Sequence, residues 1–160
     1  MAIKVGDRVP NATFTVMTAE GPKPKTSDEL FKGKKVVLFA VPGAFTPTCS
    51  NNHLPGFVKN AGAIKAKGID TIAVTGVNDV FVMDAWKKAT GGDAIEFLAD
   101  GSANFAKAIG LTADLTERGL GMRSQRYAMV VQDGVVKTLN VEDAPGKAEV
   151  SGADNLMKSL

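Results

Sequence analysis

The chain has 160 residues and a net charge of +2; 44% of its residues are hydrophobic and 22% are charged. These values are typical of a globular protein, and the length predicts a single domain over residues 1–160. Charges of both signs are interspersed without a basic stripe, which argues against a nucleic-acid partner. No apolar run approaches the roughly 20 residues that a membrane span needs, so no membrane association is expected.

The sequence contains one cysteine, Cys49. One cysteine cannot form an internal disulfide, which is typical of a reducing compartment and predicts a cytoplasmic protein. The first residues also lack the apolar core of a secretory signal peptide.

Apolar runs alternate with helical stripes along the chain, the pattern of an α/β protein. Thr13 to Met17 alternates between polar and apolar residues and predicts a half-exposed strand, and Gly21 to Pro24 predicts a turn. The continuous apolar run from Val36 to Val41 predicts a strand buried on both faces. A helix with an apolar stripe from Leu54 to Ile64 should follow, irregular at Pro55, which cannot donate a backbone hydrogen bond.

The same alternation continues to the end of the chain. Strands are expected over 71–74, 96–99, 127–131 and 135–141, helices over 80–89, 104–109 and 154–160, and a polar connection over 113–124. Asp133-Gly134 is a strong hairpin signal between the last two strands. A strand–helix–strand unit closed by an antiparallel hairpin and a helix predicts a thioredoxin-like fold, with a central mixed β-sheet flanked by helices.

Cys49 follows the apolar strand at the expected start of a helix. If Thr46 is the N-cap and Pro47 the first helical residue, Cys49 lies in the first turn, where unpaired backbone N–H groups stabilise a thiolate. The alternative for an isolated cysteine is a buried, inert thiol. Thioredoxin-type oxidoreductases carry a second cysteine where this chain has Thr46, so an internal dithiol exchange is impossible here.

His53 lies four residues after Cys49 and can share its helix face as a base. A histidine on the helix surface or at an interface is the favoured interpretation. Cysteine and histidine together do not complete a metal site, because structural zinc needs four ligands. Neither a metal ion nor a cofactor is expected.

The segment around the cysteine resembles the Pro-x-x-x-Thr-x-x-Cys signature of peroxiredoxins, carried here by Pro42, Thr46 and Cys49. The longer string over 42–57 resembles the type II (peroxiredoxin-5-like) branch, as do segments around Trp86 and Arg126, and the similarity covers nearly the whole chain. The resemblance implies a thioredoxin-like fold and the reduction of hydrogen peroxide and alkyl hydroperoxides.

The resemblance also implies a role for each matching residue. Cys49 would be the peroxidatic thiolate that becomes a sulfenic acid, and Thr46 would hydrogen-bond the thiolate and the peroxide. Pro42 would shield the sulfur from water, and Arg126 would orient the peroxide and stabilise the thiolate. Without the resemblance, Thr46 is a helix cap and Arg126 a solvated charge at a strand end.

Two-cysteine relatives carry a resolving cysteine at positions that align here with Val74 or Val150, within about a residue. Their absence implies a one-cysteine cycle in which an external thiol reduces the sulfenic acid. Glutathione or glutaredoxin is favoured over thioredoxin as that partner. The alternative function is a redox sensor or binding module, in which oxidation of the cysteine switches partner contacts.

Type II relatives often form homodimers through the face that carries the active site. Phe45 and Phe81 are the residues expected at that contact.

Overall fold

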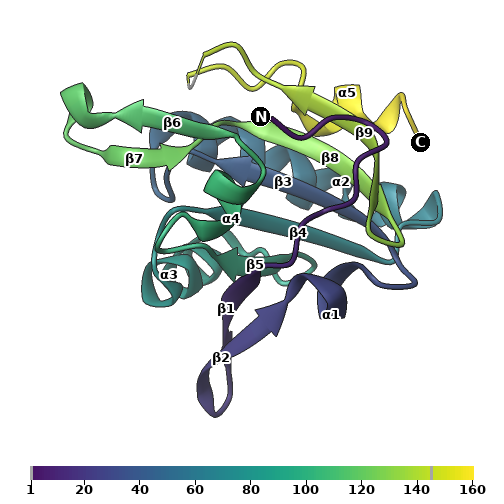
Figure 1. Ribbon diagram of the computed structural model, residues 1–160, viewed down its shortest axis with the longest axis horizontal. Helices are drawn as coiled ribbons and strands as arrows, with labels where there is room; N and C mark the ends of the chain where they lie inside the picture. The colour runs from purple at the N-terminus through teal and green to yellow at the C-terminus, as the bar shows by residue number, and fades with distance from the viewer. Residues whose placement is uncertain (1, 145) are drawn as a thin grey trace.

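The computed structural model describes residues 2–144 and 146–160 (Figure 1). Its elements in chain order are β1 (Thr13–Thr18), β2 (Gly21–Thr26), α1 (Ser27–Phe31), β3 (Lys35–Val41), η1 (Cys49–His53), α2 (Leu54–Ala66), β4 (Thr71–Gly76), α3 (Val80–Thr90), β5 (Glu96–Ala99), α4 (Asn104–Ala108), β6 (Thr112–Leu115), η2 (Thr116–Arg118), β7 (Gly121–Ser124), β8 (Tyr127–Gln132), β9 (Val135–Val141) and α5 (Ala153–Met157). In the part of the chain so described, no helix is long and apolar enough to cross a membrane.

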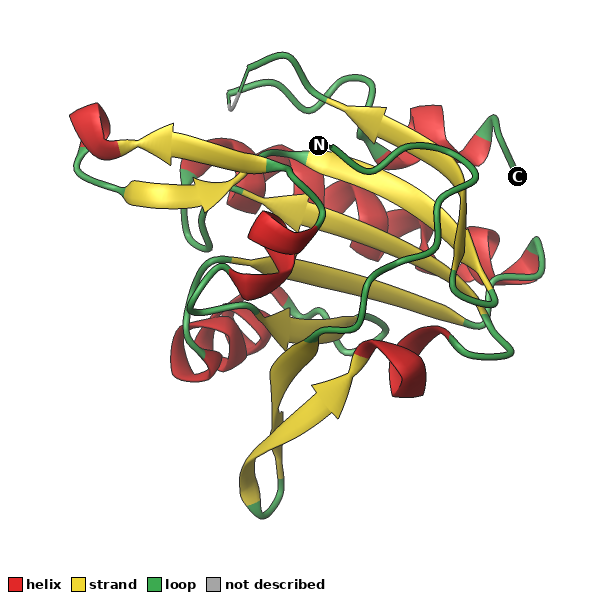
Figure 2. Ribbon diagram, viewed as in Figure 1, coloured by secondary structure: helices red, strands yellow, loops and turns green. Residues whose placement is uncertain are grey.

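Seven of the described strands form one sheet in the order β2-β1-β5-β4-β3-β8-β9. β3, β4 and β5 run parallel, whereas β1 and β8 join them antiparallel, so the sheet is mixed. Helices lie on both of its faces (Figure 2). This is the central mixed sheet flanked by helices that the order of apolar runs predicts.

β3 lies near the middle of the sheet and contributes to a separate core on each face. Val37, Phe39 and Val41 pack with residues of α2, α3 and α5. The intervening residues of β3 pack on the other face with α1, α4 and the N-terminal segment. Because all six apolar side chains of the strand are fully buried, the prediction of a strand covered on both faces is confirmed.

The prediction of a turn at Gly21 to Pro24 is wrong, because these residues belong to β2. β2 is the edge strand of the sheet, and Pro22 and Pro24 face Met17 and Thr15 of β1. Residues two apart in a strand direct their backbone nitrogens to the same side. The nitrogens of both prolines, which carry no N–H, can therefore point to the unpaired outer edge, where no hydrogen-bond donor is needed. The true hairpin turn lies at 19–20.

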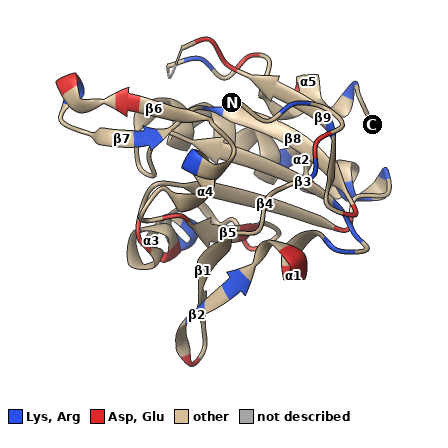
Figure 3. Ribbon diagram, in the orientation of Figure 1, with Lys and Arg blue, Asp and Glu red and all other residues tan. Residues whose placement is uncertain are grey.

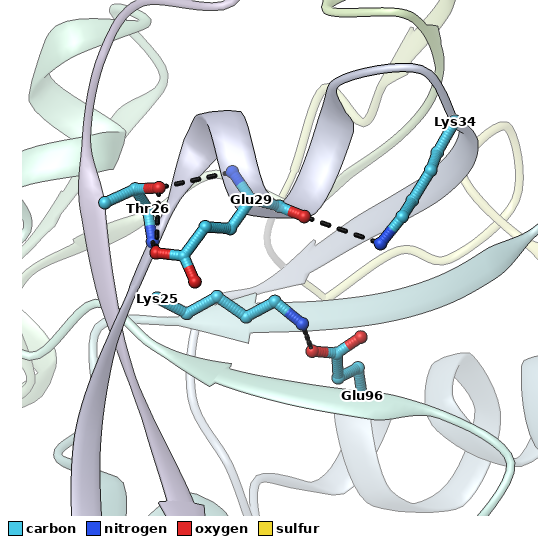
Figure 4. A network of polar contacts seen from close by, with 5 residues as sticks. All are labelled: Lys25, Thr26, Glu29, Lys34 and Glu96. Carbon is cyan, nitrogen blue, oxygen red and sulfur yellow. Dashed lines mark hydrogen bonds and ion pairs between the residues drawn. The ribbon is translucent and has the colours of Figure 1, made fainter.

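The short helix α1 is not among the expected elements, although the sequence carries its signal. Thr26 Oγ1 accepts a hydrogen bond from the Glu29 backbone N–H at 3.2 Å, and the Glu29 carboxylate accepts one from the Thr26 backbone N–H, also at 3.2 Å. This reciprocal pair is a capping box (Figure 4). Beside it, Lys25 forms an ion pair with Glu96 of β5, which ties the edge hairpin to the sheet.

The connection expected over 113–124 is instead the two-stranded β6–β7 hairpin, which projects from the body of the protein in Figure 1. Its strands have only four residues each and carry little apolar alternation, so the sequence pattern does not mark them. Basic and acidic residues are dispersed over the elements (Figure 3).

The predicted hairpin turn at Asp133-Gly134 is confirmed. Asp133 has φ 47° and Gly134 has φ 81°, the left-handed pair of a primed two-residue turn, with Gln132 paired to Val135. The Asp133 carboxylate also accepts the Gly33 backbone N–H at 2.7 Å, which anchors the turn to the start of β3.

We predict that Asp133→Ala lowers the free energy of unfolding by about 1–2 kcal/mol, because alanine lacks the acceptor and tolerates the left-handed backbone less well. Asp133→Asn keeps an acceptor oxygen and that tolerance, and should change the free energy by less than about 0.5 kcal/mol. Urea denaturation of the three proteins measures the difference. Equal stabilities of the two variants would contradict this account of the turn.

Candidate active site

Cys49 lies at the start of a helix, as the sequence predicts. β3 ends at Val41, the buried Pro42 follows, and the helix begins at Pro47, so that Cys49 lies in its first turn. The Cys49 side chain is fully buried. A short loop at the carboxyl end of a central strand therefore holds the sulfur at a helix start.

Thr46 immediately precedes the first helical residue. Its hydroxyl donates to the Gly43 carbonyl at 2.6 Å, and its own carbonyl accepts the Ser50 backbone N–H at 2.9 Å. The hydroxyl proton is thus engaged within the loop. The lone pairs of Thr46 Oγ1 remain chemically suited to accept a hydrogen bond from an incoming O–H group.

The helix is not regular around the sulfur. Residues 49–53 form the π-helical turn η1, and the Leu54 backbone N–H donates to the Cys49 carbonyl. Pro55, the expected site of irregularity, lies two residues after this turn and cannot donate. Cys49 and His53, at the two ends of the turn, both contact the guanidinium of Arg126.

Arg126 is the residue around which the site is assembled. Its side chain is only 2% exposed, although it directly precedes β8. Nη2 donates to Cys49 Sγ at 3.0 Å, and Nη1 lies 3.0 Å from His53 Nδ1. The structure thus brings Arg126 and Cys49 into contact, and the alternative of a solvated charge at a strand end is wrong. The guanidinium thus places a hydrogen-bond donor and a positive charge beside the sulfur.

The expectation of a surface or interface histidine is also wrong, since His53 is 1% exposed. An arginine can only donate, so the Nδ1 that faces Arg126 must accept, and the proton must reside on Nε2. Nε2 therefore donates to the Ser151 carbonyl, 2.9 Å away. Burial, and then the positive charge of Arg126, lower the pKa of His53 from 6.5 to about 3, so the ring is neutral at physiological pH.

Three contacts outside the sequence motif hold the loop, the helix start and the neighbouring segment after β4. Asn78 Oδ1 accepts the Ala44 backbone N–H at 2.9 Å, and Arg123 Nη1 donates to the Val77 carbonyl at 3.2 Å. Trp86, expected in the core or at an interface, is buried, and its indole N–H donates to Ser50 Oγ at 3.0 Å. Sequence reasoning missed the roles of Asn78 and Arg123, because these contacts join segments far apart in the chain.

The arrangement combines a buried sulfur nucleophile, a fixed cation and an acceptor oxygen at a helix start. These groups suit an attack by sulfur on a small electrophile whose departing oxygen gains negative charge. The Redoxin family model matches residues 4–157. This chain belongs to the redoxin family.

Its relatives are peroxiredoxins. The chain is 51% identical over 164 residues to the chloroplastic peroxiredoxin-2E-2 of Oryza sativa, covering 99% of this chain and 72% of that protein. It is 41% identical to the hybrid peroxiredoxin hyPrx5 of Haemophilus influenzae, with coverage of 100% and 67%. The crystal structure of reduced Prx3 from Vibrio vulnificus in complex with H2O2 superposes with a TM-score of 0.94, at 54% identity and 98% coverage of both chains.

These relationships confirm the resemblance to type II, one-cysteine peroxiredoxins and the predicted thioredoxin-like fold. Peroxiredoxins are thiol peroxidases, and this redoxin is one of them.

The neutral His53 predicts a specific dependence of stability on pH. Between pH 3 and 6.5 the unfolded chain binds a proton on this ring and the folded chain does not, so the free energy of unfolding falls as the pH falls through this window. We expect the parent to lose up to about 1.4 kcal/mol per pH unit more than His53→Asn, which has no titrating ring. Urea denaturation across this range measures both slopes.

Asp100 also contributes to the dependence of stability on pH. Its burial raises the pKa of its carboxyl, which affects stability in the opposite direction, but equally in both proteins. The difference between the two slopes therefore isolates His53. Identical slopes would show that His53 titrates in the folded protein as it does in the unfolded chain.

Proposed function

We propose that this peroxiredoxin reduces hydrogen peroxide and small alkyl hydroperoxides at Cys49. The hydrogen bond from Arg126 Nη2 to Cys49 Sγ, at 3.0 Å, is the observation on which the proposal depends. It sets a positive charge where the thiolate and the departing oxygen both need one. The Vibrio vulnificus relative was crystallised with H2O2, which supports this substrate class.

The first step is a two-electron transfer at sulfur. The Cys49 thiolate attacks the terminal peroxide oxygen, an S–O bond forms, and the O–O bond breaks. The remaining oxygen departs with the bond's electron pair and takes up a proton to give water or an alcohol. Cys49 becomes a sulfenic acid.

Three residues assist that step in the proposal. Arg126 stabilises the thiolate and the departing oxygen. Thr46 accepts a hydrogen bond from the peroxide, because its own proton is engaged by Gly43. Pro42, buried at the end of β3, shields the sulfur from water.

The second step uses an external thiol. A thiol attacks the sulfenic sulfur, releases water and leaves a mixed disulfide, and a second thiol restores Cys49 and departs as a disulfide. Cys49 is the only cysteine of the sequence, and the aligned positions carry Val74, buried in β4, and the exposed Val150. We therefore favour glutathione or glutaredoxin as the reductant over thioredoxin. Such a cycle suits a reducing compartment such as the cytoplasm.

Peroxide consumption by the purified protein tests this cycle. Sustained turnover is expected with glutathione plus glutaredoxin, little with thioredoxin plus its reductase, and none in Cys49→Ser. Turnover only with thioredoxin would overturn the choice of reductant. A single stoichiometric burst with either system would favour the redox-sensor alternative, for which the missing resolving cysteine is the supporting observation.

A matched pair of arginine variants tests the role of the cation. We expect Arg126→Ala to lower kcat/KM for hydrogen peroxide by about 10²–10³-fold, the usual effect of losing one oxyanion donor. Arg126→Lys keeps the charge but not the two-pronged donor geometry and should be intermediate. Arg118→Ala removes an exposed charge and should keep the parent's rate. Equal rates in the parent and both Arg126 variants would contradict the mechanism.

A second copy of the chain is proposed as a partner on the active-site face. Phe45 is 53% exposed beside the catalytic loop, and Phe81, in the first turn of α3, is 65% exposed. The Asn78–Ala44 hydrogen bond joins the loop that carries Phe45 to the segment just before α3, which carries Phe81. Large exposed aromatic side chains on one face are typical of an interface.

Sedimentation velocity tests the dimer. The parent should sediment as a dimer and Phe81→Glu as a monomer, because a carboxylate cannot be buried unpaired in an apolar contact. Val5→Glu changes an equally exposed apolar residue in the N-terminal segment and should leave the dimer intact. A dimeric Phe81→Glu protein would place the interface elsewhere.

A further inference from the structure

Two buried polar residues outside the peroxiredoxin motif are joined to each other close to the active site. Glu142, just after β9, is 7% exposed, and Ser151, just before α5, is fully buried. Glu142 Oε2 accepts the Ser151 backbone N–H at 2.7 Å and the Ser151 hydroxyl at 2.6 Å. We refer to this pair of hydrogen bonds as the Glu142–Ser151 clip.

The clip is connected at both ends to Arg126. At one end, the Glu142 backbone N–H donates to the Arg126 carbonyl at 2.9 Å. At the other end, the Ser151 carbonyl accepts from His53 Nε2 at 2.9 Å, and His53 Nδ1 accepts from Arg126 Nη1 at 3.0 Å. The hydrogen bonds therefore form a closed ring that begins at the backbone of Arg126 and returns to its guanidinium.

The direction of each hydrogen bond in this ring is fixed by chemistry. A carbonyl oxygen can only accept, so the Ser151 carbonyl requires a proton on His53 Nε2. The neutral imidazole then offers a lone pair on Nδ1, which is what the Arg126 guanidinium needs. If the Ser151 carbonyl moved away, the proton could reside on Nδ1 and would face the N–H groups of Arg126, two donors without an acceptor.

We propose that Glu142 and Ser151 are positioning residues for the reaction at Cys49. By holding the Ser151 carbonyl in place, the clip supplies the acceptor for His53 Nε2–H and so stabilises, together with Arg126, the tautomer whose Nδ1 accepts from the guanidinium. His53 in turn fixes the guanidinium that contacts Cys49 Sγ. The proposal rests on the peroxidase function proposed above. It assigns the segment after β9 a part in the chemistry, in addition to its part in the fold.

Removing the acceptor of the clip tests the proposal directly. Glu142→Ala should slow the reaction of reduced protein with hydrogen peroxide by about 10–100-fold, the scale expected when a catalytic group is misplaced by a fraction of an ångström or more. Glu142→Gln keeps an oxygen that can accept from Ser151, and should restore the rate to within about threefold of the parent.

His53 is the only histidine of the sequence, so nitrogen NMR of the imidazole reports its tautomer without ambiguity. The parent and Glu142→Gln should show the Nε2–H tautomer alone, and Glu142→Ala a mixture of the two. This readout needs no peroxide. If the parent consumes no peroxide, the proposed function fails, while the tautomer still decides whether the clip acts on His53.

Two further variants separate positioning from a general structural role. Glu149→Ala removes an exposed acidic residue from the same segment and should match the parent in rate and tautomer. Ser151→Ala loses one of the two clip hydrogen bonds and is expected to slow the reaction by about 3–10-fold, which keeps the test available if Glu142→Ala does not fold. Variants of Glu142 and Ser151 that fold and retain the parent's rate and single tautomer would overturn the proposal.

Discussion

Burial of the Arg126 guanidinium is the constraint on which the active site depends. A buried arginine must be met by acceptors or by negative charge, because the cost of removing it from water is otherwise prohibitive. The strand pairing of the sheet positions Arg126 at this site. β8 pairs antiparallel with β3 so that Tyr127 lies opposite Ala40, which sets the preceding Arg126 beside the end of β3 and the loop that follows. The sulfur of Cys49 and the Nδ1 of His53 then serve as acceptors. In the proposed mechanism the cation stabilises the sulfur nucleophile, and the sulfur in turn is an acceptor for the buried cation.

His53 makes this arrangement electrostatically consistent. Burial, and then the positive charge of Arg126, lower the pKa of His53, because a protonated ring would place a second buried positive charge 3.0 Å from the guanidinium. A neutral ring instead accepts a hydrogen bond without bringing a charge of its own. The positive charge of Arg126 is then available to the sulfur. Phe39 and Phe57, whose rings lie 5.1 and 5.6 Å from the imidazole, contribute to the burial that keeps the ring neutral.

The central strands, the Asp133-Gly134 turn and the position of Cys49 at a helix start could all be predicted, because each depends on local pattern or on a few adjacent residues. β2 could not be predicted, because a strand tolerates these prolines only at the edge of a sheet. The position of a strand within the sheet is set by the tertiary structure. Thr26 and Glu29 have the spacing of a capping box, so the start of α1 could have been predicted from them. These residues lie outside any apolar periodicity. The environment of His53 depends on Ser151, 98 residues away, and the fold alone brings these segments together. Local patterns therefore predict the nucleophile, whereas the groups that orient it come from distant parts of the chain.

The burial of Cys49 places different demands on the two halves of the catalytic cycle. A hydroperoxide is a much smaller reactant than a thiol reductant. A thiol must instead attack the sulfur in line, and a fully buried sulfur offers no such approach to glutathione and still less to a protein. In the proposed cycle, reduction by a thiol therefore requires that the sulfur become accessible. The Thr48 hydroxyl donates to the Gly146 carbonyl at 3.0 Å, so the segment between β9 and α5 lies against the first helical turn. The contacts that bury the sulfur beside Arg126 thus also limit the approach of a thiol to it.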